Sequence, residues 1–407
     1  MISFLTGVRA KLAVATSLTQ LTNFLVLLVA KTALTETDFK FLLVQLSIAG
    51  IIGVVASMRL EVLIFQKFER ETYAGILTPT FFIAITIAVS FLCVAAIDRI
   101  TTSSLTLSFL TIPILVGLAI SSVQNFIFVQ AKRLHLLLAT RFAQATASII
   151  LIIGIMNSDL LNSGDRILFV LGLSVALPST ISLIYYVWCI PSGHVASPKF
   201  YFPDLKTAKR ATWLTASTGV NSAYLNIPLL FAAATQTASF VADFGLFMRA
   251  LAAPVTLVGQ VTGRLFLADA LKWSITSKRQ PSILIRLISR AMAESVGFYI
   301  VVASALICLL WLLREPLLLT HFTLIYYLFA AAMGQSAINP VSQVRVPLRE
   351  ERIFLALDIA RLSCLSLGLY LLAPLLSLEL SFAIISLVLY SAYTGFIFQR
   401  VLRLPSL

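Results

Sequence analysis

The stretch that decides the fold is TETDFKFLLVQLSIAGIIGVVASMRLEVLIFQ, residues 35–66. A short polar start around Asp38 leads into mostly apolar residues, and about 20 such residues cross a hydrocarbon core of about 30 Å. Ionisable side chains return only near the far end, at Arg59 and Glu61. Charges are costly inside a membrane helix, so this stretch predicts a span with a functional or paired charge.

The same features recur 205 residues later, which is about half of the 407-residue chain. Four residues match at this distance: Asp38 and Asp243, Phe39 and Phe244, Arg59 and Arg264, and Leu60 and Leu265. A second match joins KRLHLLL at 132–138 with ERIFLAL at 351–357, each a charged turn that leads into an apolar run. Because the order of features is the same in both halves, we expect a parallel repeat of the kind that builds transporters.

The composition assigns the chain to the membrane. Hydrophobic residues make up 59% of it and charged residues only 12%, which is too apolar for a water-soluble core. The net charge of +13 is then the excess of Lys and Arg that cytoplasmic loops carry, and no nucleic-acid partner is expected. Most of the 30 Lys and Arg residues fall in alternate loops, which predicts that both termini are cytoplasmic.

Twelve apolar runs are candidate spans. They cover 11–31, 40–65, 77–97, 105–129, 136–156, 167–188, 210–232, 240–266, 289–313, 317–342, 353–375 and 379–399. The longest loop, 191–209, is rich in proline and divides the spans into halves 1–190 and 210–407. The sequence therefore predicts an all-α polytopic membrane protein with about twelve helices in two pseudo-symmetric six-helix bundles around a central cavity.

Signatures of soluble enzymes are missing. The chain has no Gly-rich phosphate loop, no HExxH, no GxSxG and no CxxC motif, so ATP hydrolysis, a cofactor and a metal site are not expected. The loops between spans are short and leave no room for a catalytic domain outside the membrane. These absences favour a transporter over an enzyme.

Polar side chains form stripes on several predicted spans. Gln20 and Asn23 share a face with Thr16, Asn221 follows Thr218, and Arg249, Thr256, Gln260 and Arg264 follow one face of the eighth span. Such stripes face a bundle interior or water, because an unpaired polar group in hydrocarbon costs several kcal/mol. They are candidates for the walls of a pathway.

Other polar residues have a structural interpretation. We expect Gln144, Ser148, Gln335 and Asn339 to join helices by hydrogen bonds, and Gly259 and Gly263 to allow close helix packing. Arg141, Arg264 and Arg361 lie near cytoplasmic ends of spans, where a side chain either reaches the interface or faces the interior.

Four segments carry a family resemblance: LTETDFKFLLVQLSI at 34–48, SMRLEVLI at 57–64, QAKRLHLLLATRFAQA at 130–145 and DFGLFMRALAAPVTLVGQVTGRLF at 243–266. They resemble the polysaccharide-transporter branch of the multidrug/oligosaccharidyl-lipid/polysaccharide exporter superfamily. Lys40 departs from the family, which usually has Gly at that position.

The resemblance implies a flippase for polyprenyl-diphosphate-linked oligosaccharides in a bacterial inner membrane, with a cavity lined by spans one, two, seven and eight. It implies membrane lipid and the lipid-linked oligosaccharide as partners, and a polysaccharide polymerase and a chain-length regulator as further ones. We assign diphosphate attraction to Arg59, Arg249 and Arg264, sugar contacts to Gln20, Asn23, Asn221 and Gln260, and proton coupling to Glu61 or Asp243.

Two alternatives remain open. One is a small-molecule or multidrug exporter of the same superfamily, whose coupling usually needs an acidic residue in the first span, and residues 11–30 contain none. The other is an integral-membrane polysaccharide polymerase or ligase, which characteristically has a large outer loop that this chain lacks.

Overall fold

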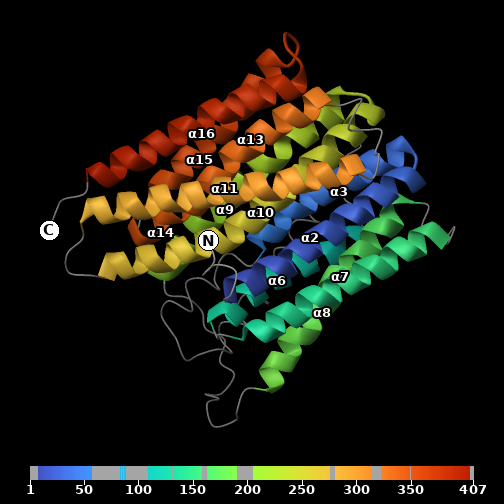
Figure 1. The fold of residues 1–407 in the computed structure, drawn as a ribbon, viewed down its shortest axis with the longest axis horizontal. Coiled ribbons are helices and arrows are strands. Elements are labelled where there is room, and N and C mark those ends of the chain that lie inside the picture. Colours follow the sequence, from blue (N-terminus) through green and yellow to red (C-terminus); the bar gives the residue numbers. More distant parts are fainter. Residues whose placement is uncertain are drawn as a thin grey trace. The chain divides into compact units, whose positions relative to one another are not determined.

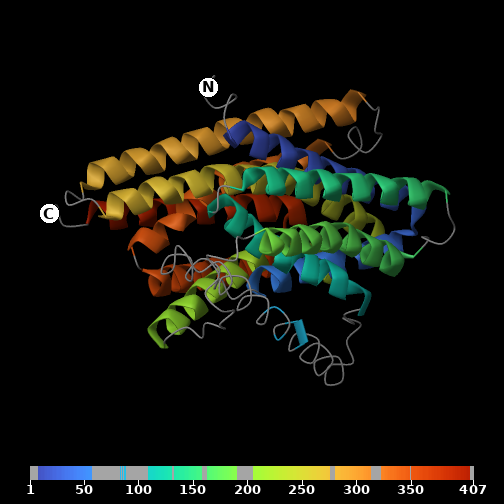
Figure 2. The same cartoon turned by 90° about the horizontal axis from the view of Figure 1, so that it is seen from below.

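The computed structural model describes residues 8–56, 83, 85, 87–88, 109–130, 133–157, 163–189, 205–275, 280–312, 322–348 and 350–403. Every regular element in this part of the chain is helical (Figures 1 and 2). The helices are α2 (Val8–Ala33), α3 (Glu36–Val55), α6 (Ile112–Gln130), α7 (Leu134–Asn157), α8 (Gly164–Trp188), α9 (Leu205–Thr235), α10 (Ala238–Ile275), α11 (Pro281–Leu312), α13 (Phe322–Val341), α14 (Arg345–Leu348), α15 (Glu351–Leu372) and α16 (Leu378–Leu402), with 3₁₀ turns η1 (Phe109–Thr111) and η4 (Ser342–Val344).

The all-α prediction is confirmed, and each predicted span except 77–97 has a helix in its place. Within the described residues, seven helices have segments long and apolar enough to cross a membrane. These segments belong to α3, α7, α8, α10, α11, α15 and α16. The predicted span 77–97 lies almost entirely outside the described residues.

Three helices run further than the hydropathy pattern indicated, among them α11, which begins at Pro281, eight residues before its predicted span 289–313. Helix α9 begins at Leu205, inside the predicted linker 191–209, and α10 continues past the predicted end of its span to Ile275. The first turns of α9 contain Lys206, a good helix former that hydropathy alone counts as loop. A helix does not have to end where its apolar stretch ends.

The described helices form two compact units, Met1–Ala242 and Asp243–Leu407. In the first unit, α2 packs on α7, α6 on α8, and α3 on both α6 and α9. In the second, α13 packs on α11 and α16, and α15 packs on α16. Helix α9 belongs to the first unit because it packs on α3, so these units do not coincide with the halves 1–190 and 210–407. The division into these halves stays a prediction.

Glycines allow the close crossing of α6 and α8. A methyl group at Gly117 would lie 2.9 Å from the backbone nitrogen of Ala176, and one at Gly172 would lie 2.8 Å from the carbonyl carbon of Pro113. Both distances are shorter than normal van der Waals contact. The backbones of these helices therefore approach as closely as the small side chains permit.

Two helix connections in the first unit share one design. Thr35 caps α3 by accepting a hydrogen bond from the backbone N–H of Asp38, and Thr237 caps α10 in the same way through Phe240. Thr35 and Thr237 are 202 residues apart, three fewer than the sequence match at 205. In the register of these turns Asp38 corresponds to Phe240, so the sequence match with Asp243 is three residues out of step.

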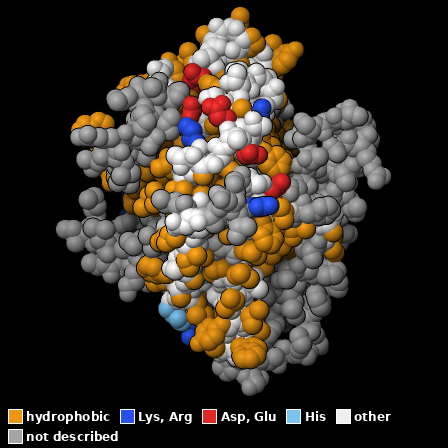
Figure 3. Space-filling model, turned by 90° about the vertical axis from the view of Figure 1, so that its right-hand side faces the viewer, with side chains coloured by type: hydrophobic (Ala, Val, Ile, Leu, Met, Phe, Trp, Pro, Cys, Tyr) orange, Lys and Arg blue, Asp and Glu red, His pale blue; other side chains and the backbone are white. Residues whose placement is uncertain are grey.

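Large apolar side chains are exposed on helices of both units. Examples are Ile150 on α7, Ile181 on α8, Val301 on α11 and Tyr370 on α15, each more than half exposed. Figure 3 shows hydrophobic side chains over much of one face and acidic and basic side chains gathered in another part of it. Exposed apolar helix faces of this kind are expected where lipid is the solvent.

Candidate functional site

The predicted polar stripe on α2 faces α7. Asn23 accepts a hydrogen bond from the Ser148 hydroxyl at 3.1 Å, and the Thr19 hydroxyl donates to the backbone carbonyl of Arg141, also at 3.1 Å. Gln20 is half-buried and lies three residues before Asn23, so the two share a face. The helix-joining interpretation of Ser148 is confirmed, and its partner is Asn23, a predicted sugar contact.

The stripe on α9 lies near α3. Ser222 donates a hydrogen bond to the backbone carbonyl of Gly50 at 3.0 Å, and Asn226 donates to the carbonyl of Ser222 at 2.9 Å. Asn221, half-buried, immediately precedes Ser222 on the same helix. The structure thus joins α9 to α3 through Ser222 and α2 to α7 through Asn23.

Helix α10 carries the predicted residues Asp243 and Arg249. Asp243 is buried and Arg249 is half-buried, six residues further along. Arg264 and Gln260 also lie on α10, but their side chains are outside the described part, as are Arg59 and Glu61 altogether. The grouping of Arg59, Arg249 and Arg264 in one cavity therefore stays a prediction.

Gly259 on α10 is a packing device, as predicted for the glycine pair, whereas Gly263 has room for a methyl group. A methyl group at Gly259 would collide with the side chain of Asn339 on α13, and one at Gly263 would lie 3.5 Å from the Cα of Pro340. Both neighbours belong to the second unit. Asn339 therefore fills the space that the missing side chain leaves on α10.

Arg141 and Gln144 centre a buried group of polar side chains in the first unit. Arg141 donates from Nη1 to Gln144 at 2.9 Å and from Nη2 to Asn125 on α6 at 2.8 Å. Gln144, which is 1% exposed, donates in turn to the Ser179 hydroxyl on α8 at 2.9 Å. We call Asn125, Arg141, Gln144 and Ser179 the N-unit polar cluster; it ties α7 to the helix before it and the helix after it.

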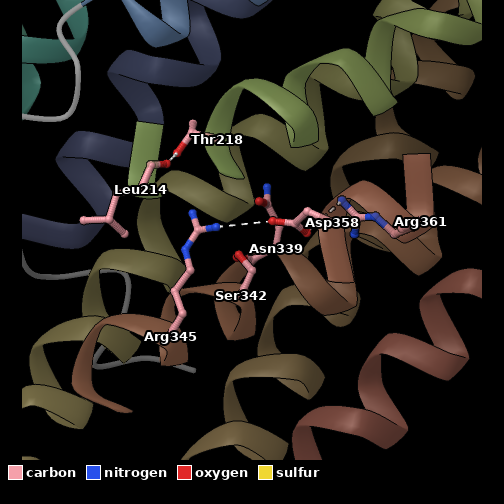
Figure 4. Close-up of polar contacts among 7 residues, drawn as sticks. All are labelled: Leu214, Thr218, Asn339, Ser342, Arg345, Asp358 and Arg361. Carbon is pink, nitrogen blue, oxygen red and sulfur yellow. Dashed lines mark hydrogen bonds and ion pairs between the residues drawn. The ribbon is translucent and has the colours of Figure 1, made fainter. Parts of the chain in front are cut away.

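A charged group occupies the comparable place in the second unit. The carboxylate of Asp358 lies 3.5 Å from Arg345 and 3.7 Å from Arg361, and all three side chains are at most 8% exposed (Figure 4). The guanidinium carbon of Arg361 lies 5.0 Å from the ring centre of Tyr393 on α16, within cation–π range. We call Arg345, Asp358, Arg361 and Tyr393 the C-unit charge cluster.

The two clusters have the same plan. In each, one helix carries a polar pair three residues apart, Arg141 with Gln144 on α7 and Asp358 with Arg361 on α15. The first member of each pair contacts the element before it and the second contacts the helix after it. This likeness supports the internal repeat. The clusters differ in chemistry, because an acidic residue is central only to the second.

These clusters were not predicted as sites. The helix-joining role of Gln144 is confirmed, but Arg141 and Arg361 do not reach toward an interface: both are held by specific partners. The sequence contained one usable signal, since residues three apart on a helix are neighbours. The contacts with Asn125, Arg345 and Tyr393 come from other elements and have no signal in the local sequence.

Comparison with known proteins identifies the fold. No family model and no curated protein sequence matches the chain. Among solved structures, a MATE protein in complex with MaD3S has a TM-score of 0.69 at 15% identity, over 96% of this chain and 94% of that one. A multidrug resistance MATE family transporter of the MOP superfamily, in an outward-facing conformation, gives a TM-score of 0.63 at 13% identity over 98% and 97%. A MATE transporter of Vibrio cholerae gives 0.59 at 12% identity over 98% of each chain.

The chain therefore has a MATE-like transporter fold over almost its whole length. This confirms the predicted fold class. At these identities the likeness shows the fold alone, so the polysaccharide-transporter branch remains an expectation.

Proposed function

We propose that this protein is a membrane carrier that exports its substrate by alternating access. The observation that carries the proposal is the MATE-like fold, which covers almost the whole chain and is shared with proteins described as transporters. Two helical units that carry comparable polar clusters suit a carrier, in which two halves rock about a central site. The likeness gives no support to a polysaccharide polymerase or ligase.

For the substrate, one candidate is a polyprenyl-diphosphate-linked oligosaccharide. This candidate rests on the sequence resemblance and on arginines within membrane helices, among them Arg249 on α10. A diphosphate has to cross an apolar slab, and guanidinium groups are the side chains best suited to hold it. Arg59, Arg249 and Arg264 would attract the diphosphate, Gln20, Asn221 and Gln260 would contact sugar hydroxyls, and Asn23 would contribute only if its bond to Ser148 opens.

The second candidate is a small-molecule or multidrug exporter of the same superfamily. The comparisons support this candidate more directly, because a structural neighbour is described as a multidrug resistance transporter. The absence of acidic residues from 11–30 weighs against a cationic drug as cargo. The two candidates therefore differ in the charge of the substrate.

Under either candidate the protein would lie in a bacterial inner membrane with both termini cytoplasmic, and Glu61 or Asp243 would carry the coupling proton. Under the first, a polysaccharide polymerase and a chain-length regulator would be its partners. Cysteine labelling of residues 1–7 and 404–407 from each side of the membrane checks the placement of the termini.

One experiment separates the candidates. The protein is depleted in its host, and both the membrane face of lipid-linked oligosaccharide and the sensitivity to cationic and anionic drugs are measured. Accumulation of completed units on the cytoplasmic face, with unchanged drug sensitivity, would support the flippase. Increased drug sensitivity with normal surface polysaccharide would support the small-molecule exporter. If depletion changed neither property, the proposed export function would be contradicted.

A further inference from the structure

Arg141 is a half-buried cation whose side-chain hydrogen bonds, within the described residues, go to neutral groups. Its terminal nitrogens bond to two neutral amides, Gln144 at 2.9 Å and Asn125 at 2.8 Å, and its Nε is buried without a hydrogen bond. Within the part of the chain that the structure describes, Arg141 makes no ion pair with an acidic side chain. Leaving a charge uncompensated in an apolar protein interior is costly.

The position of Arg141 along α7 adds to that cost. Arg141 lies seven residues after Leu134, the first residue of α7, which is about 10 Å along the helix axis. It also lies inside the segment His135–Ile155, one of the helices apolar enough to span a membrane. The charge is thus held inside the span by its partners and does not simply extend to water at the helix end.

The hydrogen bonds fix the direction in which the surrounding amides point. Arginine has only donors, so the oxygens of Asn125 and Gln144 have to face the guanidinium. The amide nitrogen of Gln144 is then turned toward Ser179 and the backbone carbonyl of Val175, at 2.9 and 3.3 Å. Because the oxygen of Asn125 accepts the bond from Arg141, the amide nitrogen of Asn125 is not used in that bond.

The second unit shows what neutralisation looks like in this fold. There Asp358 lies within 3.7 Å of both Arg345 and Arg361, and the three side chains are buried together. The N-unit polar cluster has Arg141 and Gln144 at the comparable places and no carboxylate. An anion that neutralises Arg141 would therefore come from outside these four residues.

We propose that Arg141 and Asn125 form an anion-binding site for a phosphate or diphosphate group. The half-buried guanidinium still has N–H groups beyond those used for Asn125 and Gln144, and phosphate oxygens accept such bonds strongly. The amide nitrogen of Asn125 adds a neutral donor. This inference rests on the proposed carrier function and deepens its flippase form, because it adds a phosphate contact within α6 and α7.

The test measures binding of inorganic pyrophosphate to the purified full-length protein in neutral detergent, by calorimetry at constant ionic strength. The decisive variant is Asn125→Asp, which supplies Arg141 with an internal carboxylate and should keep the fold intact. We expect binding of pyrophosphate to weaken at least about tenfold in Asn125→Asp and in Arg141→Gln. The matched control is Arg290→Gln, which removes the same charge from an exposed pair on α11 and should bind as the wild type does.

A second arm identifies the source of the phosphate. The protein is placed in phosphatidylcholine nanodiscs that contain either farnesyl diphosphate or phosphatidylglycerol. Binding is followed by the quenching of the tryptophan fluorescence of the protein. If farnesyl diphosphate binds and phosphatidylglycerol does not, the ligand is a lipid diphosphate. If pyrophosphate binds in detergent and farnesyl diphosphate does not bind in nanodiscs, the ligand is a soluble anion. If no probe binds the wild type, or if Asn125→Asp and Arg141→Gln bind as the wild type does, the proposed site is wrong.

The outcome is separable from that of the proposed function. If the protein binds the anion but exports nothing in reconstituted vesicles, the proposed site is supported and the proposed carrier function is wrong. If the protein exports its substrate but binds no anion, and Asn125→Asp keeps full export activity, the carrier function is supported and the proposed site is wrong.

Discussion

The guanidinium of Arg345 lies 3.5 Å from the carboxylate of Asp358, and both side chains are buried between α14 and α15. Asp358 also pairs with Arg361 at 3.7 Å, so one carboxylate serves two cations. We expect Asp358→Asn to lower the free energy of unfolding by about 3–5 kcal/mol, because it leaves two buried cations without a counter-charge. Unfolding by sodium dodecyl sulfate in mixed micelles measures the loss.

The control for this prediction is an exposed ion pair. Glu294 pairs with Arg290 at 2.7 Å on α11, and the two side chains are 46% and 72% exposed. Glu294→Gln should therefore change the free energy of unfolding by less than about 0.5 kcal/mol. Equal effects of the two substitutions would show that burial does not matter at Asp358.

Gly172 is the residue on α8 that limits its approach to α6. Gly172→Ala should lower the free energy of unfolding by about 1–3 kcal/mol, because the added methyl group would lie 2.8 Å from the backbone of Pro113. Gly297→Ala on α11 is the matched control: nothing lies within 4 Å of the added carbon, so alanine should be neutral or stabilising by up to about 1 kcal/mol. If Gly172→Ala left the free energy of unfolding unchanged, α6 and α8 could move apart to accommodate the methyl group without loss of stability.

The threonine caps of α3 and α10 should contribute similarly to stability. Thr35→Ala and Thr237→Ala each remove the acceptor for one backbone N–H, at Asp38 and Phe240 respectively, and each should cost about 1 kcal/mol. Thr→Ser at either position keeps the hydroxyl and should restore most of the loss. A thermal unfolding series of the four variants checks this, and a cost at only one position would contradict the equivalence of the two turns.

Arg249 tests the charge of the substrate. If the cargo is anionic, Arg249→Gln should reduce export at least about tenfold at normal protein level, because a charge-assisted contact inside a membrane is lost. Export of a cationic drug should be unchanged or improved. Vesicle assays with both kinds of substrate compare the variant with Arg290→Gln, and equal export of the anionic substrate by the two variants would remove Arg249 from the site.

The fold could be predicted well because hydropathy and length suffice to find membrane helices. The apolar runs predicted α2, α6, α7 and the other long helices within several residues. Hydropathy did not predict the polar ends of α9 and α10, because a helix is held by its backbone hydrogen bonds and continues past the lipid-facing stretch. The 202-residue spacing of the threonine caps differs from the 205-residue sequence match, since matching residue letters do not have to mark matching turns.

The site was harder to predict than the fold. Single polar residues such as Gln144 and Ser148 were correctly interpreted as joining helices, because unpaired polar groups inside a membrane are costly. Whether an arginine such as Arg141 or Arg361 turns inward depends on its partners on other helices. The sequence does not show those partners until the packing of the helices is known.

The spacing of the two threonine caps bears on how Asp38 and Asp243 compare. Asp38 accepts a hydrogen bond from the hydroxyl of Thr35 within the capping turn, whereas Asp243 is buried almost one helical turn deeper. The two acids therefore do not occupy matching positions relative to the threonine caps. A role found for Asp38 therefore gives no ground for assigning the same role to Asp243.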